Sequence, residues 1–335
     1  MSNNQRKLLL STNKGLVIFE RTPAGWRFEK DVFMGLPVST AFVDPRDGTW
    51  WACLAHRHWG TKLQRSTDGG QNWQEVPAPR YPADAQLKSG KSATLRYVWI
   101  MTHAGADRPG ELYLGTEPGG LFVSKDGGDH FELLHSLWNH PSRKDEWFGA
   151  GRDEPYIHSI VVDPRDSQHF YIAVSCAGVF ETTDNGLHWT VRNEGLRADF
   201  LPEPYAKIGH DPHLMLACAS QPDVLWQQNH CGVFRSTDGA VTWQEITDRE
   251  GLAVYGFALG IDHDDPERAW VIPAISDEMR MAIDRSLCVC RTEDGGKSWQ
   301  ALRKGLPQGN CYDLVLRHAL AVHNNVLAFG TTNGN

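Results

Sequence analysis

Short runs of alternating apolar and polar residues recur along the chain, and they predict β-strands. Typical runs are GLFVS at 120–124, GVFET at 178–182 and GVFRS at 232–236, each followed by a glycine-containing turn segment. A period of two places the apolar side chains on one face of a strand. No long segment shows the helical spacing i, i+3, i+4, i+7, so we expect an all-β fold.

An eight-residue motif follows such strands five times. Its pattern is Ser/Thr-x-Asp-x-Gly-x-x-aromatic, with one departure at Ala240, and it occurs as STDGGQNW (66–73), SKDGGDHF (124–131), TTDNGLHW (182–189), STDGAVTW (236–243) and TEDGGKSW (292–299). The five aspartates are 58, 58, 54 and 56 residues apart. An Asp carboxylate accepts N–H groups two residues on, a Ser or Thr hydroxyl adds a local hydrogen bond, and glycine supplies a positive φ. The motif therefore predicts a hairpin turn, with its aromatic residue packed on a neighbouring sheet.

Each repeat supplies four strands, which we call A to D in chain order. In the third repeat, HSIVVDP (158–164) and HFYIAVS (169–175) precede the strand at 178–182, and the motif forms the C–D turn. Four-stranded antiparallel sheets repeated at a fixed period are typical of a β-propeller. We expect a single propeller domain over residues 1–335.

The number of strands bears on the number of blades. The N-terminal segment supplies three strands, the five repeats twenty and the C-terminal segment two, which makes 25. A ring of four-stranded blades needs 24 strands for six blades and 28 for seven. We favour seven blades, with the chain ending mid-blade. The alternative is six blades, in which a strand near 312–319 pairs with the N-terminal strands and residues 325–335 are left over.

Composition narrows the functional classes. The net charge of −8 gives no basic surface for nucleic acid. No apolar run reaches the roughly 18 residues of a membrane span, and the first residues lack the apolar centre of a signal peptide. The seven cysteines have no metal-finger spacing, which predicts free thiols in a reducing cytoplasm.

The five motifs resemble the BNR or Asp-box repeat of sialidases, sortilin-type receptors, plant-wall glucanases and a photosystem assembly factor. Three further stretches, DEPYIHSIVVDPRDS, GHDPHLMLACASQPDVLWQQNHCGVFRSTDG and SDEMRMAIDRSLCVCRTEDGG, are similar to a bacterial group described as glycosyl hydrolases with BNR repeats. The resemblance covers almost the whole chain and implies a sialidase-like propeller that hydrolyses or binds glycans. The arginine of sialidases that stands in an Arg-Ile-Pro triplet has no counterpart here, which argues against classical sialidase activity.

The topology divides the loops between two faces of the propeller. The A–B turns and the Asp-boxes fall on one face, and the B–C and D–A loops fall on the other, which we call the long-loop face. This face collects the long segments 78–95, 136–157, 194–212 and 275–286. Because function concentrates on long loops held by a rigid scaffold, we expect the site there.

Three interpretations of the long-loop face stay open. In the first, two carboxylates hydrolyse a glycosidic bond, and their separation is about 5 Å for retention or about 6.5–9.5 Å for inversion. The catalytic candidates are Asp153, Glu154, Asp211, Asp277 and Glu278. Trp59 and Trp147 would be stacking platforms for the sugar. The ligand-binding candidates, several of which also serve the other interpretations, are His56, His58, Trp59, Glu117, Arg152, His158, His213, His230, Arg280, Tyr312 and Asp313.

In the second interpretation, a divalent metal binds at a His-rich channel mouth. The ligands would come from His56 and His58, from His210 and His213, and from His158 or His230. In the third, the face binds a protein or peptide without chemistry, as an interaction or assembly scaffold. The expected partner is a carbohydrate or another polar small ligand, or a protein, and neither nucleic acid nor a membrane.

Overall fold

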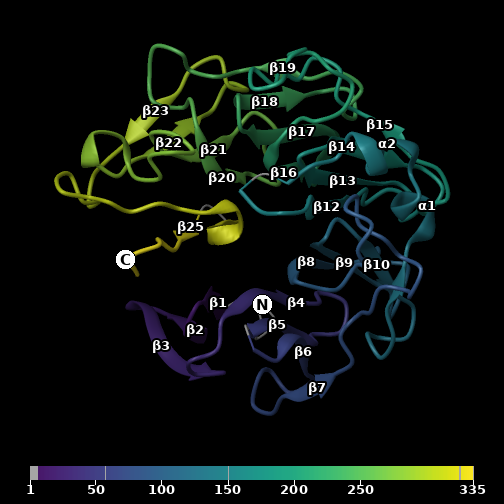
Figure 1. Ribbon diagram of the computed structural model, residues 1–335. Coiled ribbons are helices and arrows are strands. Elements are labelled where there is room, and N and C mark those ends of the chain that lie inside the picture. Colours follow the sequence, from purple (N-terminus) through teal and green to yellow (C-terminus); the bar gives the residue numbers. More distant parts are fainter. Residues whose placement is uncertain (1–6, 57, 150, 324–325, 335) are drawn as a thin grey trace.

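The computed structural model describes residues 7–56, 58–149, 151–323 and 326–334, and their strands form antiparallel sheets placed around a central axis (Figure 1). The fold is a β-propeller, as the alternating pattern and the repeat period predict, and it has six blades. Blade 1 has three strands: β1 (Lys7–Thr12), β2 (Gly15–Thr22) and β3 (Gly25–Val32). Blades 2 to 6 have four strands each.

The four-stranded blades follow one another along the chain. Blade 2 contains β4 (Val38–Val43), β5 (Trp50–His56), β6 (Gly60–Ser66) and β7 (Gln74–Val76). Blade 3 contains β8 (Tyr97–His103), β9 (Leu112–Glu117), β10 (Leu121–Ser124) and β11 (Glu132–Leu133). Blade 4 contains β12 (Tyr156–Val162), β13 (Phe170–Ser175), β14 (Gly178–Thr182) and β15 (Thr190–Val191).

Blade 5 contains β16 (Pro212–Cys218), β17 (Gln221–Asn229), β18 (Gly232–Ser236) and β19 (Gln244–Glu245). Blade 6 contains β20 (Gly256–Ile261), β21 (Ala269–Pro273), β22 (Val289–Thr292) and β23 (Gln300–Leu302). The loops hold four short helices, α1 (His135–Trp138), α2 (Pro141–Asp145), η2 (Ile283–Arg285) and η3 (Arg317–Ala319). Within the described residues, no helix combines the length and the apolar character needed to cross a bilayer.

The prediction of seven blades is wrong. Among the described residues, the last two strands, β24 (Leu320–His323) and β25 (Val326–Phe329), pair with each other alone and form a two-stranded sheet beside blade 6 rather than a further blade. The detail of the six-blade alternative is also wrong, because residues 312–316 form no strand and 317–319 form η3. The Arg317 side chain explains this local structure, since its bonds hold η3 against the inner strands.

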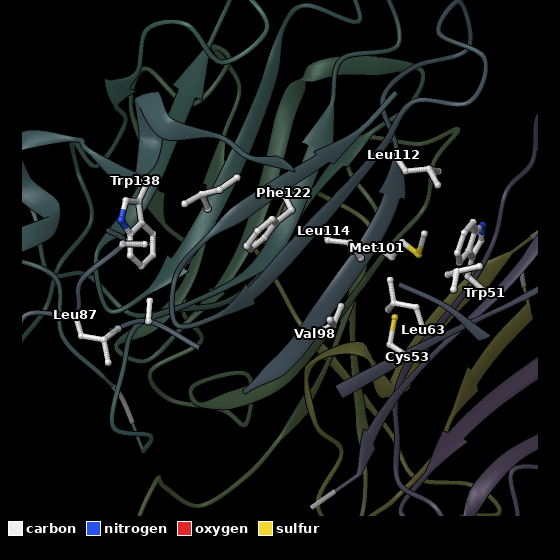
Figure 2. Packing of buried hydrophobic residues seen from close by; sticks show 14 residues of the cluster. Trp51, Cys53, Leu63, Leu87, Val98, Met101, Leu112, Leu114, Phe122 and Trp138 are labelled. Atoms are coloured by element: carbon white, nitrogen blue, oxygen red, sulfur yellow. The ribbon is translucent and has the colours of Figure 1, made fainter. Parts of the chain in front are cut away.

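The first strand of each four-stranded blade lies innermost, and neighbouring inner strands contact each other. β4 lies beside β8, β8 beside β12, β12 beside β16 and β16 beside β20. The apolar residues between the sheets form the core. Between blades 2 and 3, for example, Trp51 and Leu63 pack with Met101, Leu114 and Phe122 (Figure 2).

The five Asp-boxes are hairpin turns between the third and fourth strands. In the first box, Ser66 Oγ donates to Asp68 (2.8 Å) and accepts from the Gly70 amide (2.9 Å). Asp68 accepts from the amide of Asn72, four residues on, at 2.9 Å, rather than from the residue two positions on that we expected. The same bonds recur in the other four boxes. As predicted, box aromatics reach a neighbouring blade: the Trp243 and Trp299 indoles donate to main-chain carbonyls there.

The A–B turns join blades through arginines. Arg46 pairs with Asp44 at 2.6 Å and donates to the carbonyls of Arg108 and Glu111 in blade 3. Arg165 of blade 4 donates to Asp223 of blade 5 at 2.6 Å. These turns therefore connect adjacent blades in addition to reversing the chain.

Candidate functional site

Five inner strands each have a β-bulge near their start, at the long-loop face. We call the part of this face around the central axis the mouth. The pairing register with the second strand skips one residue in each case: Ser39, Trp99, His158, His213 and Phe257. A bulged residue leaves the ladder and its side chain is re-aimed. In each of blades 2 to 6, the bulge therefore places one side chain of the inner strand outside the regular alternation, near the start of that strand.

Asp211, His213 and His230 meet beside the bulge of blade 5. Pro212 pairs with Asn229, so the antiparallel β16–β17 ladder brings Asp211 next to His230, whose amide donates to the Asp211 carbonyl at 2.9 Å. The Asp211 Oδ2 atom lies 3.5 Å from His213 Nε2 and 3.6 Å from His230 Nδ1. One ligand atom from each residue falls within 4.8 Å of the others.

The outer nitrogen of His213 has a hydrogen-bond acceptor, and that of His230 faces a carboxylate at longer range. His213 Nδ1 donates to the Gly256 carbonyl at 2.6 Å, and its ring stacks on Phe257 at 4.5 Å between centroids. His230 Nε2 lies 3.8 Å from Asp277 Oδ2. Asp277 comes from the loop after β21, so blades 5 and 6 build this cluster together.

Burial and charge set the protonation of the cluster. Asp211 is 3% exposed and its Oδ1 atom has no hydrogen-bond partner. Burial favours protonation of Asp211, but His213, His230 and the Arg317 charge outweigh it and hold its pKa well below the usual range. Burial lowers the pKa of His213, whereas the Asp211 carboxylate raises the pKa of His230. At neutral pH the cluster therefore holds a carboxylate beside a neutral His213 imidazole.

An aromatic and arginine belt extends from the cluster around the channel. Trp99 stacks on Tyr156 at 4.3 Å. The Arg317 guanidinium lies over three rings, those of Trp99, Tyr156 and Phe257, at 5.4–5.5 Å. We call these four residues the belt.

Arg152 and Glu117 extend the belt on blades 3 and 4. Arg152 lies over Tyr97 (4.8 Å) and Trp99 (5.0 Å), and its Nη1 atom is 3.1 Å from Glu117 Oε2. Burial raises the pKa of Glu117, and the Arg152 charge opposes this. Glu117 is therefore an arginine-paired carboxyl in the wall of the mouth.

Asp153 and Glu154 line a separate surface pocket of about 330 Å³ with Lys88, Arg143 and Phe148. Asp153 is 89% exposed and pairs with Arg96 at 3.3 Å, while Glu154 lies in the pocket wall. Trp147 is 1% exposed and donates to Ser142, so its ring is not available as a stacking platform.

Several predicted site residues lie outside the cluster. His56 caps the β5–β6 turn by accepting from the amides of His58 and Trp59, and Trp59 is 70% exposed there; Arg57 lies outside the described residues. Glu278 and Tyr312 are exposed. Asp313 is buried and accepts from Thr331, a bond within the C-terminal segment.

The structure separates the predicted metal ligands. His210 is buried with Nε2 bonded to the Ala206 carbonyl, and His158 is buried with Nδ1 bonded to Ser159. Neither belongs to the three-residue cluster, which instead contains Asp211. Arg280 lies over Phe257 at 5.5 Å and so belongs to the mouth.

The sequence reasoning missed the belt. Trp99, Tyr156 and Phe257 look like ordinary strand aromatics, and Arg317 is an isolated cation in an apolar segment. The signal available was their recurrence near the start of each inner strand. The bulges that re-aim Trp99 and Phe257 depend on the partner strand and leave no mark in the local pattern.

Comparisons with known proteins agree with the fold. The sequence profile of the BNR/Asp-box repeat matches residues 64–75. An oligoxyloglucan-reducing end-specific xyloglucanase of Emericella nidulans is 24% identical over 223 residues, which cover 61% of this chain and 25% of that protein. The chain thus spans about a quarter of the length of the curated relative that it matches.

Solved β-propellers superpose on most of the chain. A GH74 enzyme from Niastella koreensis gives a TM-score of 0.59 at 17% identity, covering 89% of this chain and 44% of that one. YCF48 from Cyanidioschyzon merolae gives 0.59 at 14% identity, covering 98% and 90%, and YCF48 bound to D1 peptide gives 0.53 at 15% identity, covering 93% and 82%. These likenesses show the fold: the chain is an Asp-box β-propeller similar to glycosyl hydrolase and YCF48 propellers.

Proposed function

We propose that the chain binds a carbohydrate at the long-loop mouth and acts on it as a glycosyl hydrolase-like enzyme. The observation that carries the proposal is the position of two carboxylates, Asp211 and Asp277, on either side of the His230 imidazole. Inverting glycosidases use two carboxyl groups about 6.5–9.5 Å apart, and we assign that role to Asp211 and Asp277, with the His230 ring between them. Of the belt rings beside them, Trp99 is partly exposed, while Tyr156 and Phe257 are buried.

The charge of the mouth favours an acidic sugar. Arg152, Arg280 and Arg317 all lie over aromatic rings of the mouth. A guanidinium binds a carboxylate through two parallel hydrogen bonds. We therefore propose that the substrate carries a sialic or uronic acid residue, although this chain lacks the Arg-Ile-Pro arginine of sialidases. The similarity to a xyloglucanase and a GH74 enzyme supports a glycan in general and makes xyloglucan oligosaccharides the neutral reference.

The test is hydrolysis of a glycoside panel that contains sialosides, oligouronides and xyloglucan oligosaccharides. We expect turnover of an acidic member, and NMR of the first product should show inversion. Asp277→Asn should lower kcat by about 10²-fold or more, and Glu278→Gln, its exposed neighbour, is the matched control. Neither binding nor turnover of any member, or full activity of Asp277→Asn, would refute the proposal.

A second candidate is a non-catalytic scaffold that binds a peptide or protein. The likeness to YCF48 extends over nearly the whole of both chains, and one of those structures holds a peptide. Under this alternative, a pull-down yields a stoichiometric partner while the glycoside panel shows no turnover. Arg152→Ala should then weaken partner binding, and Asp277→Asn should leave it unchanged.

The compartment is a separate proposal. All seven cysteines are free, and six are buried. Free thiols persist in a reducing environment, which supports the cytoplasm. Fractionation of the native host with a thiol-alkylation assay tests this.

A further inference from the structure

We infer that Asp211, His213 and His230 form a binding site for a divalent transition metal. The proposal rests on the geometry of these three side chains and needs no glycan, but a bound ion would take Asp211 out of the carboxylate pair of the proposed function. Their ligand atoms lie within 4.8 Å of one another, and the cluster is the group of metal-ligating side chains that the described residues bring together.

The hydrogen bond to Gly256 determines which nitrogen of His213 is free. A carbonyl only accepts, so His213 Nδ1 carries the proton at the 2.6 Å contact. In the neutral imidazole, Nε2 then has a lone pair, and this lone pair faces Asp211 Oδ2 at 3.5 Å. Two acceptors that face each other in a buried place repel unless a cation lies between them.

His230 repeats the arrangement with a carboxylate as its outer partner. Its Nδ1 is 3.6 Å from the same Asp211 oxygen, and its Nε2 faces Asp277. Metal-binding histidines usually donate their other ring N–H to a carbonyl or carboxylate, which orients the ring and raises its basicity. His213 has such a partner in the Gly256 carbonyl, and the Asp277 carboxylate lies 3.8 Å from His230 Nε2, beyond hydrogen-bond distance.

The spacing and donor types fit a metal of the zinc class. Two ligands at about 2.1 Å from one tetrahedral ion are about 3.4 Å apart, close to the two observed separations. The second Asp211 oxygen, Oδ1, is buried and accepts no hydrogen bond of ordinary geometry from the described residues, and the Cys176 thiol lies against the same carboxylate. Two imidazoles and one carboxylate leave a coordination position open for water or another ligand, as in catalytic zinc sites and in non-haem iron sites.

A bound ion changes the role of Asp211. As a metal ligand it no longer acts as an acid or base, and Asp277 becomes the carboxylate that orients His230. The metal site and the glycan site therefore fail separately: binding of Zn²⁺ is measured without any glycan, and glycan binding is measured with and without a chelator.

The experiment titrates the purified, chelator-treated chain with Zn²⁺ in an isothermal calorimeter. Elemental analysis of the loaded protein gives the metal content, and the absorption of the Co²⁺ form is a spectroscopic readout. We expect about one equivalent per chain, with visible Co²⁺ bands. Asp211→Asn and His230→Ala should each weaken binding at least tenfold, and Asp277→Asn should weaken it about tenfold without abolishing it. His230 is partly exposed, so its variant should fold, which circular dichroism confirms.

The matched control is the double variant His56→Ala/His58→Ala, which removes the imidazoles of the β5–β6 turn. It should bind Zn²⁺ as the parent does. The proposal is overturned if neither Zn²⁺ nor Co²⁺ binds the parent, if binding survives both Asp211→Asn and His230→Ala, or if the control loses it.

Discussion

The Arg317 guanidinium donates a 2.8 Å hydrogen bond to the Tyr156 hydroxyl, from a position 161 residues further along the chain. Arg317 belongs to η3 and Tyr156 begins the inner strand of blade 4. Because the same guanidinium also lies over Trp99 and Phe257, it joins the C-terminal segment to blades 3, 4 and 6.

Arg317→Met should lower the free energy of unfolding by about 2 kcal/mol, because the buried Tyr156 hydroxyl loses its charged hydrogen-bond donor and the aromatic rings lose their cation. Tyr156→Phe should lower it by about 1 kcal/mol. Urea unfolding of both single variants and the double variant measures the coupling, which we expect near 1 kcal/mol. Arg21→Met, in which a surface guanidinium leaves Trp26, is the control and should lose less than about 1 kcal/mol. Strictly additive effects would contradict the contact.

The fifth position of the Asp-box separates two glycine substitutions. Gly128 has φ +88°, and a Cβ there would overlap the Trp51 ring of blade 2. Gly128→Ala should therefore destabilise the protein by about 3 kcal/mol, through overpacking and a left-handed backbone. Thermal and urea unfolding measure the change.

The natural counterpart, Ala240, is the control for this position. It has φ +61° and is buried. Ala240→Gly relieves the backbone but removes a buried methyl and loosens the unfolded chain, so its effect should stay within about 1 kcal/mol of zero. A larger loss from Ala240→Gly than from Gly128→Ala would show that ring overlap is not the decisive term.

The Asp-box carboxylates should make the fold sensitive to acid. Backbone and side-chain hydrogen bonds lower the pKa of Asp126, Asp184 and Asp294 to about 2. A folded pKa below the unfolded value of about 3.9 adds stability that is complete above that value and is lost as the pH falls towards 2. Circular dichroism between pH 5 and 2 should show this loss, and the double variant Asp126→Asn/Asp294→Asn should lose less over the same range although it starts less stable. If the double variant lost as much stability as the parent protein between pH 5 and 2, the box carboxylates would not be the source of the acid sensitivity.

His169 should have the opposite pH dependence. The Glu181 carboxylate, 2.8 Å from His169 Nε2, raises the pKa of this histidine, with Asp163 adding to the effect and Arg165 opposing it. A folded pKa above the unfolded value of about 6.5 stabilises the fold below pH 6.5, and the contribution disappears as the pH rises through the folded pKa. His169→Gln should cost about 1–2 kcal/mol at pH 6 and less at pH 9. His188→Gln, at an exposed box histidine, is the control, and an equal cost of His169→Gln at both pH values would contradict the prediction.

The sequence was sufficient for the architecture. A period-two pattern, five turn motifs and their near-constant spacing predict four-stranded antiparallel blades, because each depends on residues close together in the chain. The number of blades was not predicted correctly. The last strands pair with each other after η3, and Arg317 of η3 contacts Tyr156 and aromatic neighbours on other blades, which the local pattern does not record.

The candidate site was predicted only in part. The face and the residues Asp211, His213, His230, Asp277 and Arg280 follow from placing long loops and strand ends by topology. Their grouping into one cluster does not, since it depends on the Pro212–Asn229 register and on the bulge at His213. His56, His58 and Trp59 lie on the same predicted face, yet they form a local turn of their own.

The sequence by itself therefore determines the turns and the strands, since both depend on contacts within a few residues. The packing of blades around the axis decided the rest: which imidazoles converge, where Arg317 lies, and how the last strands pair. These features depend on registers and bulges between distant segments, and their energies arise only when the strands are assembled.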